Sequence, residues 1–353
     1  LLRRSHMGLP VFDLHCDLLS YLVGERGHTP FDAQVHCSIP QLKAGNVRLQ
    51  VMAIFTETKA NSSQHGLDQA EVFKVFANQY SLDFDSVQVV DVLPRLLTSN
   101  KVGILAAIEN ASAFCEEQEP LDVGLERLRT IFGKVGRPLY VSLTWNSENR
   151  FGGGALTNVG LKNDGRKLIE FLGSKQIAVD ISHASDTLAH DIFTFIDQNN
   201  LDVSVIASHS NVRKVCEVPR NLSDDLLQEI FKRQGLVGLN FVRAFLGPDP
   251  DSFCRQIEEM IRLGGEHSIA FGADFFYEED APSNTYGNSP DGWYFSDYDS
   301  SECYPRLLEL FRKRLSLSDS LLANIAYQNA ADYLARLWKE KESQVVTSGK
   351  LSP

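Results

Sequence analysis

The sequence predicts a single domain of the (β/α)8 type, a TIM-like barrel, and three observations lead to this fold class. Eight short apolar runs recur along the 353 residues, helical patterns lie between most of them, and no linker divides the chain. The runs are almost continuously apolar, as in parallel strands that are covered on both faces. The first run leads into residues 13–18, which lack the glycine-rich turn that a doubly wound fold would need. An α/β barrel with its helices outside is therefore the expected architecture.

The elements follow one another in a regular order. The apolar runs place the strands at 9–12, 47–55, 102–108, 139–143, 177–181, 203–207, 236–241 and 269–272. Apolar residues at helical spacing predict helices at 164–175, 186–199, 223–234 and 251–263. Ser185 and Ser223 stand at the N-cap positions of two of these helices. A long helical stretch at 67–99, after the second strand, and further helices after residue 305 are expected as additions to the barrel.

The two ends of the chain are set apart from this barrel. Residues 1–8 read LLRRSHMG and resemble an expression-tag remnant that leads into Met7. The catalytic barrel is therefore expected to span 9–340, with a C-terminal tail at 341–353. No signal peptide is visible, because the two arginines near the start are not followed by an apolar segment.

Composition narrows the classes of partner and compartment. The chain has 46 acidic and 34 basic residues, a formal net charge of −12 and no basic run. This balance argues against nucleic acid as a partner. No apolar stretch reaches the roughly 18 residues that a transmembrane helix needs. The six cysteines are scattered and form no CxxC pair, which predicts reduced thiols and a cytoplasmic protein.

Polar residues follow the predicted strands at the end of the barrel where chemistry collects. They are Asp13, His15 and Asp17 after the first strand, Glu109 after the third, His183 and His209 after the fifth and sixth, and Asp274 after the eighth. Histidines and carboxylates together favour divalent ions, with zinc as the first choice for mixed nitrogen and oxygen ligands. Glu109 could bridge two ions, and a water between them would be the nucleophile. Asp274 is a candidate proton carrier. Taken singly, Glu109 could instead be a solvated rim residue.

The motifs DLHCD, IEN, VDISH, VIASHSN, PRNLSD and FGADF stand in the order found in the membrane dipeptidase family. The chain resembles this family, also called renal dipeptidase or peptidase M19, from about residue 11 to 335. The family lies within the amidohydrolase superfamily, and the LTWN sequence at 143–146 is similar to its bacterial branch.

The resemblance implies a metalloprotease-type hydrolase with two zinc ions, or other divalent ions, that cleaves L,L dipeptides. Whether it also cleaves L,D dipeptides is left open by the resemblance. By matching position, His15 and Asp17 would hold one ion, His183 and His209 the other, and Glu109 both. A metal-bridging hydroxide would attack, Asp274 would move the proton, and Arg220 would bind the substrate carboxylate. Asn221 would support Arg220, and Asp13 would orient His15. A homodimer is also implied.

The chain departs from the family at the rim of the site. Trp145 stands where mammalian members carry a histidine that contacts the reacting carbonyl, and Asn146 is a candidate replacement donor. These changes keep open another superfamily activity, on an N-acyl amino acid, a lactone or another amide. A silent binding protein is disfavoured, because every expected ligand is present. The acidic, aromatic loop at 274–302 is interpreted either as a lid or as a rim or dimer contact.

Overall fold

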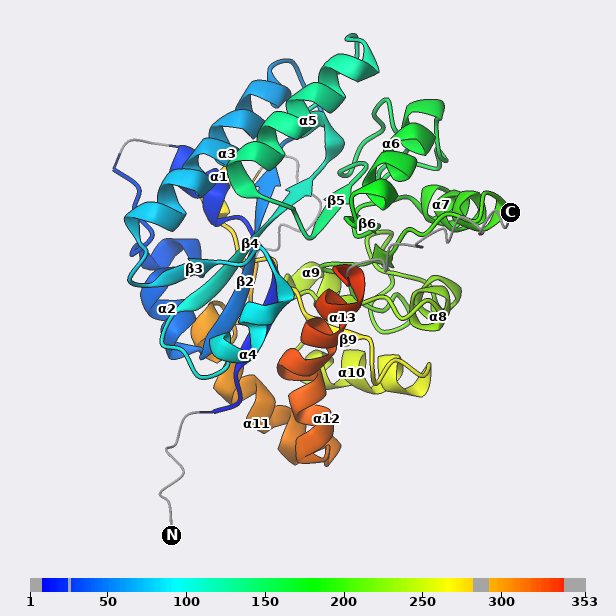
Figure 1. The fold of residues 1–353 in the computed structure, drawn as a ribbon. Helices are drawn as coiled ribbons and strands as arrows, with labels where there is room; N and C mark the ends of the chain where they lie inside the picture. Colours follow the sequence, from blue (N-terminus) through cyan, green and yellow to red (C-terminus); the bar gives the residue numbers. More distant parts are fainter. Residues whose placement is uncertain (1–7, 25–26, 282–291, 340–353) are drawn as a thin grey trace, which may run out of the picture.

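The computed structural model describes residues 8–24, 27–281 and 292–339, and a ring of parallel strands lies at its centre (Figure 1). Within these residues the strands of the ring are β1 (Val11–Cys16), β2 (Val47–Phe55), β4 (Val102–Glu109), β5 (Tyr140–Ser142), β6 (Ala178–Asp180), β7 (Val205–Ile206), β8 (Val237–Leu239) and β9 (Ile269–Phe271). They pair in the order β7-β6-β5-β4-β2-β1-β9-β8. A parallel bridge between Ala207 and Val237 brings β7 against β8, so the barrel is nearly closed. The predicted (β/α)8 fold class is confirmed, and all eight predicted strands are present.

Helices surround the strands (Figure 1). They are α1 (Leu18–Val23), α2 (Ile39–Ala44), α3 (Ser62–Gln79), α4 (Leu93–Leu96), α5 (Leu121–Val135), α6 (Asn163–Ser174), α7 (Asp186–Gln198), α8 (Asp224–Lys232), α9 (Arg243–Leu246), α10 (Ser252–Arg262), α11 (Tyr304–Leu315), α12 (Asp319–Ala323) and α13 (Asn329–Leu337). The predicted helices α6, α7, α8 and α10 are confirmed to within two residues. The Oγ of Ser185 accepts a hydrogen bond from the backbone N–H of Leu188, as expected of the N-cap of α7.

The predicted helical stretch at 67–99 is wrong in its second half. Helix α3 ends at Gln79, and a short strand, β3 (Phe84–Ser86), pairs with the start of β4 outside the ring. A 3-10 turn at Val90–Val92 precedes the four residues of α4, which has a proline near its start. Valines are frequent between these elements, and β-branched side chains favour extended backbone over helix. The additions after residue 305 are confirmed as α11, α12 and α13.

Strand residues pack on two faces, as the period of two requires. On β2, Leu49 and Val51 join a cluster that includes residues of α13, whereas Met52 and Ile54 join the larger cluster formed with the other helices. The strands are thus buried on both sides, which explains their continuous apolar sequence.

Some sequence predictions concern residues that lie outside the described ones. They are the tag-like segment up to residue 7, positions 282–291 of the acidic loop, and the tail from residue 340 onward. None of the helices within the described residues is both long enough and apolar enough to span a membrane.

Candidate active site

Glu109, the last residue of β4, lies at the centre of a group of histidines from three other strand ends. Its Oε2 lies 3.2 Å from Nε2 of His15, and its Oε1 lies 2.7 Å from Nε2 of His183 and 3.6 Å from Nε2 of His209. The Nε2 atoms of His183 and His209 are only 3.0 Å apart. All four side chains are buried. Residues from β1, β4, β6 and β7 therefore converge because parallel barrel strands end on the same face.

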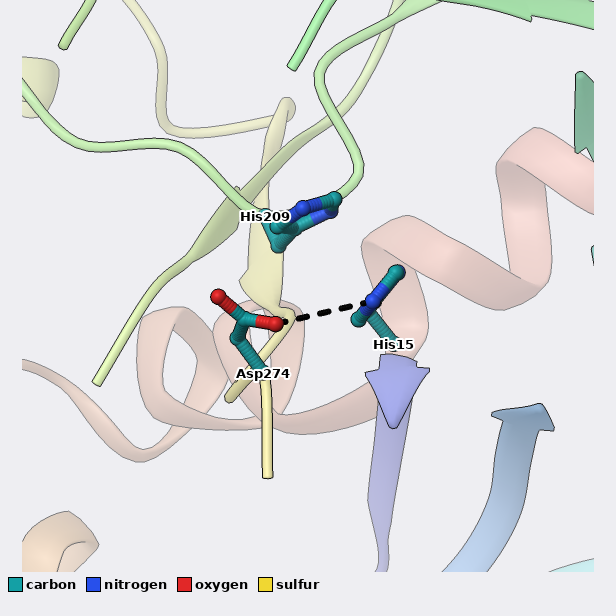
Figure 2. A group of neighbouring side chains, drawn as sticks. All are labelled: His15, His209 and Asp274. Carbon is teal, nitrogen blue, oxygen red and sulfur yellow. Dashed lines mark ion pairs between the residues drawn. The ribbon is translucent and has the colours of Figure 1, made fainter. Parts of the chain in front are cut away.

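Two further carboxylates approach His15. Oδ2 of Asp17 and Oδ1 of Asp274 each lie 3.5 Å from its Nε2. Figure 2 shows Asp274 directed toward His15, with His209 beside them, and the rings of the two histidines stack with centroids 3.7 Å apart. Three overlapping groups have the spacing of metal ligands: His15, Asp17 and Glu109; Glu109, His183 and His209; and His15, His209 and Asp274. The structure thus brings together all five predicted metal-ligand residues and the predicted proton carrier.

The outer nitrogens of His15 and His183 contact acceptors behind the cluster. The hydroxyl of Tyr140 donates to the carbonyl of Leu14 at 3.1 Å, so it accepts the proton on Nδ1 of His15 at 2.7 Å. Oδ1 of Asn146 accepts from Nδ1 of His183 at 2.9 Å. In both rings the proton is held on Nδ1, which directs the Nε2 lone pair of a neutral imidazole toward the centre.

His209 is held by a chain of hydroxyl groups. Its Nδ1 lies 2.7 Å from Oγ of Ser208, which lies 3.2 Å from Oγ of Ser182. Ser182 donates its hydroxyl proton to Oδ1 of Asp180 at 2.9 Å. Because Ser182 uses its own proton on Asp180, Ser208 donates to Ser182 and accepts from His209. The Nε2 of His209 is therefore also left as an acceptor at the centre.

Burial and neighbouring charges determine which residues of the cluster are protonated. Burial and the nearby Arg220 lower the pKa of His183 to about 4. Burial, together with the charge of His15, holds the pKa of His209 well below its ordinary value. Burial opposes the charge of Glu109, but His15 and His183 outweigh it and hold the pKa of Glu109 well below its ordinary value. The centre thus contains an ionised Glu109 and neutral His183 and His209, the forms that bind metal ions. Burial opposes the charge of His15, but Tyr140, Glu109 and Asp17 outweigh it and hold the pKa of His15 well above its ordinary value. A metal ion at His15 would therefore displace its proton.

The pKa values of Asp17 and Asp274 shift upward, in the opposite direction to that of Glu109. Burial raises the pKa of Asp17 to about 6 and that of Asp274 to about 7. The backbone of Asp274 has a φ of 63°, a conformation that is uncommon outside glycine. Two contacts hold it there: Asn240 donates to its Oδ2 at 2.9 Å, and the Tyr294 hydroxyl donates to its backbone carbonyl at 2.7 Å. A carboxyl with a pKa near neutrality is thus fixed in place beside the histidines.

The donor set fits divalent cations. Among the described residues, the buried Nε2 of His15 and Oδ1 of Asp17 have no hydrogen-bond partner. The Nε2 lone pairs of His183 and His209 face each other at 3.0 Å and cannot donate to each other when both rings are protonated on Nδ1. A cation between such groups would satisfy them, and buried polar groups without partners are costly.

The predicted substrate residues lie in different places. Arg220 is buried, and its Nη2 lies 3.1 Å from Nε2 of His183. Trp145 and Asn146 line a pocket with about 630 Å³ of empty space, whose floor includes Glu109 and His183. Neither Arg220 nor Asn221 is among the residues that line this pocket, and Arg220 lies behind His183.

Asn221 and Asp13 support the backbone around the site. The amide of Asn221 donates to the carbonyls of Cys216 and Phe245, which ties the loop after β7 to helix α9. Asp13 accepts from the backbone N–H groups of His15 and Ala273, and from the Tyr304 hydroxyl. Asp13 therefore fixes the main chain of His15, whereas Tyr140 contacts the ring. A register shift in β1 between Asp13 and Cys16 accompanies this difference in direction.

Four residues around the cluster were missed by sequence reasoning. Ser208 repeats the Ser–His pair that also ends β6, and this repeat was an available signal. Asn240 follows β8 on the same face, where the strand-end rule applies. Tyr140 lies inside a strand and Tyr294 lies in a long loop, and neither position distinguishes a site residue from a packed aromatic residue.

Comparisons with known proteins agree with this geometry. A family model described as membrane dipeptidase (peptidase family M19) matches residues 2–347. An uncharacterised dipeptidase of Schizosaccharomyces pombe is 26% identical over 373 residues, which cover 96% of this chain and 83% of that protein. An uncharacterised protein of Acinetobacter calcoaceticus is 28% identical and covers 68% of this chain and 83% of its own length.

A solved structure shares the fold. It is a metallopeptidase of Rhodobacter sphaeroides liganded with a phosphinate mimic of the dipeptide L-Ala-D-Ala. The TM-score is 0.79 at 20% identity, over 94% of this chain and 100% of that chain. Since the family match extends over nearly the whole chain, this protein belongs to the membrane dipeptidase family, peptidase family M19, and is a hydrolase that acts on peptide bonds.

Proposed function

We propose that this protein is a binuclear zinc dipeptidase. The observation that carries the proposal is the convergence of three Nε2 atoms on the two carboxylate oxygens of Glu109. His15 and Asp17 would hold one ion, His183 and His209 the other, and Glu109 would contribute to both. Mixed nitrogen and oxygen donors favour zinc. Zinc at such a centre supplies Lewis acidity and lowers the pKa of water.

Asp274 is the residue that we assign to proton transfer. Its Oδ1 faces His15, its Oδ2 accepts from Asn240, and its pKa is raised to about 7 by burial. A carboxyl that titrates near neutral pH can take up a proton and return it within one catalytic cycle. Asp274 would thus deliver a proton to the nitrogen of the departing amine.

Arg220 is the residue that we assign to the substrate carboxylate. Its buried Nη2 lies 3.1 Å from His183, so its guanidinium borders the metal-ligand cluster. The Nε of Arg220 has no hydrogen-bond partner among the described residues. Nη1 and Nη2 already donate to Ser210 and to the carbonyl of His209, so the unused Nε–H is the donor available to a carboxylate oxygen. A dipeptide held there by its carboxylate would place its peptide bond near Glu109 and Asp274.

The proposed substrates are L,L dipeptides and also L,D dipeptides. The mimic of L-Ala-D-Ala bound to the Rhodobacter sphaeroides protein supports the second class. A different superfamily activity stays as the alternative because of Trp145 in the pocket wall. Asn146 already binds His183 through Oδ1, which leaves only its amide N–H groups for a substrate oxygen.

A hydrolysis assay tests the proposal. Protein stripped by a chelator is assayed with L-Ala-L-Ala, L-Ala-D-Ala, a lactone and an N-acyl amino acid, before and after addition of two equivalents of zinc. We expect zinc to restore hydrolysis of dipeptides. If two zinc ions bind and only the lactone or the N-acyl amino acid is cleaved, the dipeptidase assignment is wrong.

A further inference from the structure

We propose that this pocket selects dipeptides with large apolar side chains, an inference that rests on the dipeptidase function proposed above. The floor of the pocket contains three of the predicted metal ligands, Asp17, Glu109 and His183, together with Asp274, whereas its walls come from strand ends and the segments that follow them. The floor would act on the peptide bond and the backbone charges, which all dipeptides share. Discrimination between dipeptides therefore depends on the walls.

The first wall consists of Phe55 and Trp145. Phe55 ends β2, and Trp145 lies three residues beyond the end of β5. Their rings meet edge to face with centroids 5.2 Å apart, and the Trp145 ring lies 5.9 Å from that of His183. This aromatic pair thus stands beside a ligand histidine, within reach of a substrate bound over the floor.

The second wall is also aromatic. Phe276 and Trp293 line the pocket and pack edge to face with centroids 5.0 Å apart. Phe245 lines the same pocket, and its ring lies 5.7 Å from the guanidinium of Arg220. If the substrate carboxylate is bound by Arg220 as proposed, Phe245 would lie beside the C-terminal residue of the dipeptide. Apolar surface is therefore available on both sides of the scissile bond.

The lack of basic side chains among the described wall residues also favours dipeptides with apolar side chains. Among the described residues that line the pocket, none is lysine or arginine. An acidic side chain would leave water without gaining a cation in the walls, which is unfavourable. An apolar side chain would leave water at a gain of about 25 cal/mol per Å² of buried area.

The first test compares three substrates on the zinc-loaded protein. We expect kcat/KM for L-Leu-L-Leu to exceed that for L-Ala-L-Ala by at least about tenfold, since a single methylene in an apolar pocket already changes this ratio by about 10- to 200-fold. L-Glu-L-Glu should be the poorest of the three. Equal values for the first two dipeptides, or a preference for L-Glu-L-Glu, would overturn the proposal.

The second test removes the walls one at a time. Phe55→Ala and Phe276→Ala should each lower the ratio of kcat/KM between L-Leu-L-Leu and L-Ala-L-Ala. Phe31→Ala is the matched control, because Phe31 is 51% exposed and does not line the pocket. Bound zinc, measured for each variant, shows that the floor has stayed intact. An unchanged ratio in both wall variants would also overturn the proposal.

These measurements separate two kinds of failure. If the zinc-loaded wild type cleaves none of the dipeptides, the dipeptidase function itself is refuted. If it cleaves all of them without preference for apolar side chains, only the specificity inference is refuted.

Discussion

Tyr140→Phe is the substitution that tests most directly how the site orients His15 and fixes its tautomer. The Tyr140 hydroxyl lies 2.7 Å from Nδ1 of His15 and donates to the carbonyl of Leu14. Both rings are fully enclosed. The substitution keeps the aromatic ring in place and removes only the oxygen. The Nδ1 of His15 then loses its acceptor, so nothing holds the proton on Nδ1 and the lone pair on Nε2.

The expected loss follows from the role of such a partner. Groups that orient a metal-binding histidine from behind contribute about 10- to 100-fold in metal affinity. At 1.36 kcal/mol per decade, this is about 1.4–2.7 kcal/mol. The lost bond is short and buried, which supports a value within that range rather than below it. Zinc affinity of Tyr140→Phe should therefore fall by one to two orders of magnitude.

The assay is competition for zinc against a chromophoric chelator. Tyr333→Phe is the matched control, since Tyr333 is also buried and donates one hydrogen bond, at 2.8 Å, to Oγ of Ser204 outside the site. The control should lose some stability and keep its zinc affinity. Wild-type affinity in Tyr140→Phe, or an equal loss in Tyr333→Phe, would refute the argument that Tyr140 orients His15.

Three further predictions concern the carboxyl and histidine groups. Asp274→Asn should lower kcat by several orders of magnitude and retain both zinc ions by elemental analysis; near-normal turnover would remove Asp274 from the mechanism. His209→Ala should lose one zinc ion and nearly all activity, whereas His190→Ala, which changes an exposed histidine paired with Asp225, should lose neither. In chelator-treated protein, the folded Asp274 carboxyl has a pKa of about 7 against 3.8 for its ordinary value. The folded state therefore binds this proton more tightly than the unfolded state, and its stability falls as the pH rises toward 7. In denaturant titrations, the free energy of unfolding of the wild type should fall by about 2–3 kcal/mol relative to Asp274→Asn between pH 5 and pH 8. A difference between the two proteins that stays constant over this pH range would contradict the prediction.

The metal-ligand cluster could be predicted because it depends on one property of the fold. Once the strands were placed, every polar residue at a strand end was expected on one face. Glu109 and His209 illustrate this rule: Glu109 directly follows a buried apolar run, His209 lies two residues beyond one, and both reach the shared centre. No pairing between distant residues had to be known beyond the closure of the barrel.

Contacts that depend on side-chain direction could not be predicted in the same way. The alternation of residues along β1 predicted that Asp13 orients the ring of His15, but Asp13 accepts from the main-chain N–H of His15 and from the Tyr304 hydroxyl instead. Asn221 follows Arg220 in the chain, yet its amide donates to the carbonyls of Cys216 and Phe245 and does not line the pocket. Tyr140 lies 125 residues from His15, and only the closed barrel brings its hydroxyl to that ring.

The site thus separates what binds metal from what selects substrate. The ligands stand at or just beyond strand ends, where the barrel fixes the backbone, and the partners of His15 and His209, Tyr140 and Ser208, are buried as well. The aromatic walls lie at or beyond the strand ends, and none of the predicted metal ligands is among them. Changing a wall should therefore alter the choice of dipeptide while zinc binding persists, and changing an orienting partner such as Tyr140 should do the reverse. A wall variant that loses zinc would show that the two functions are coupled in this barrel.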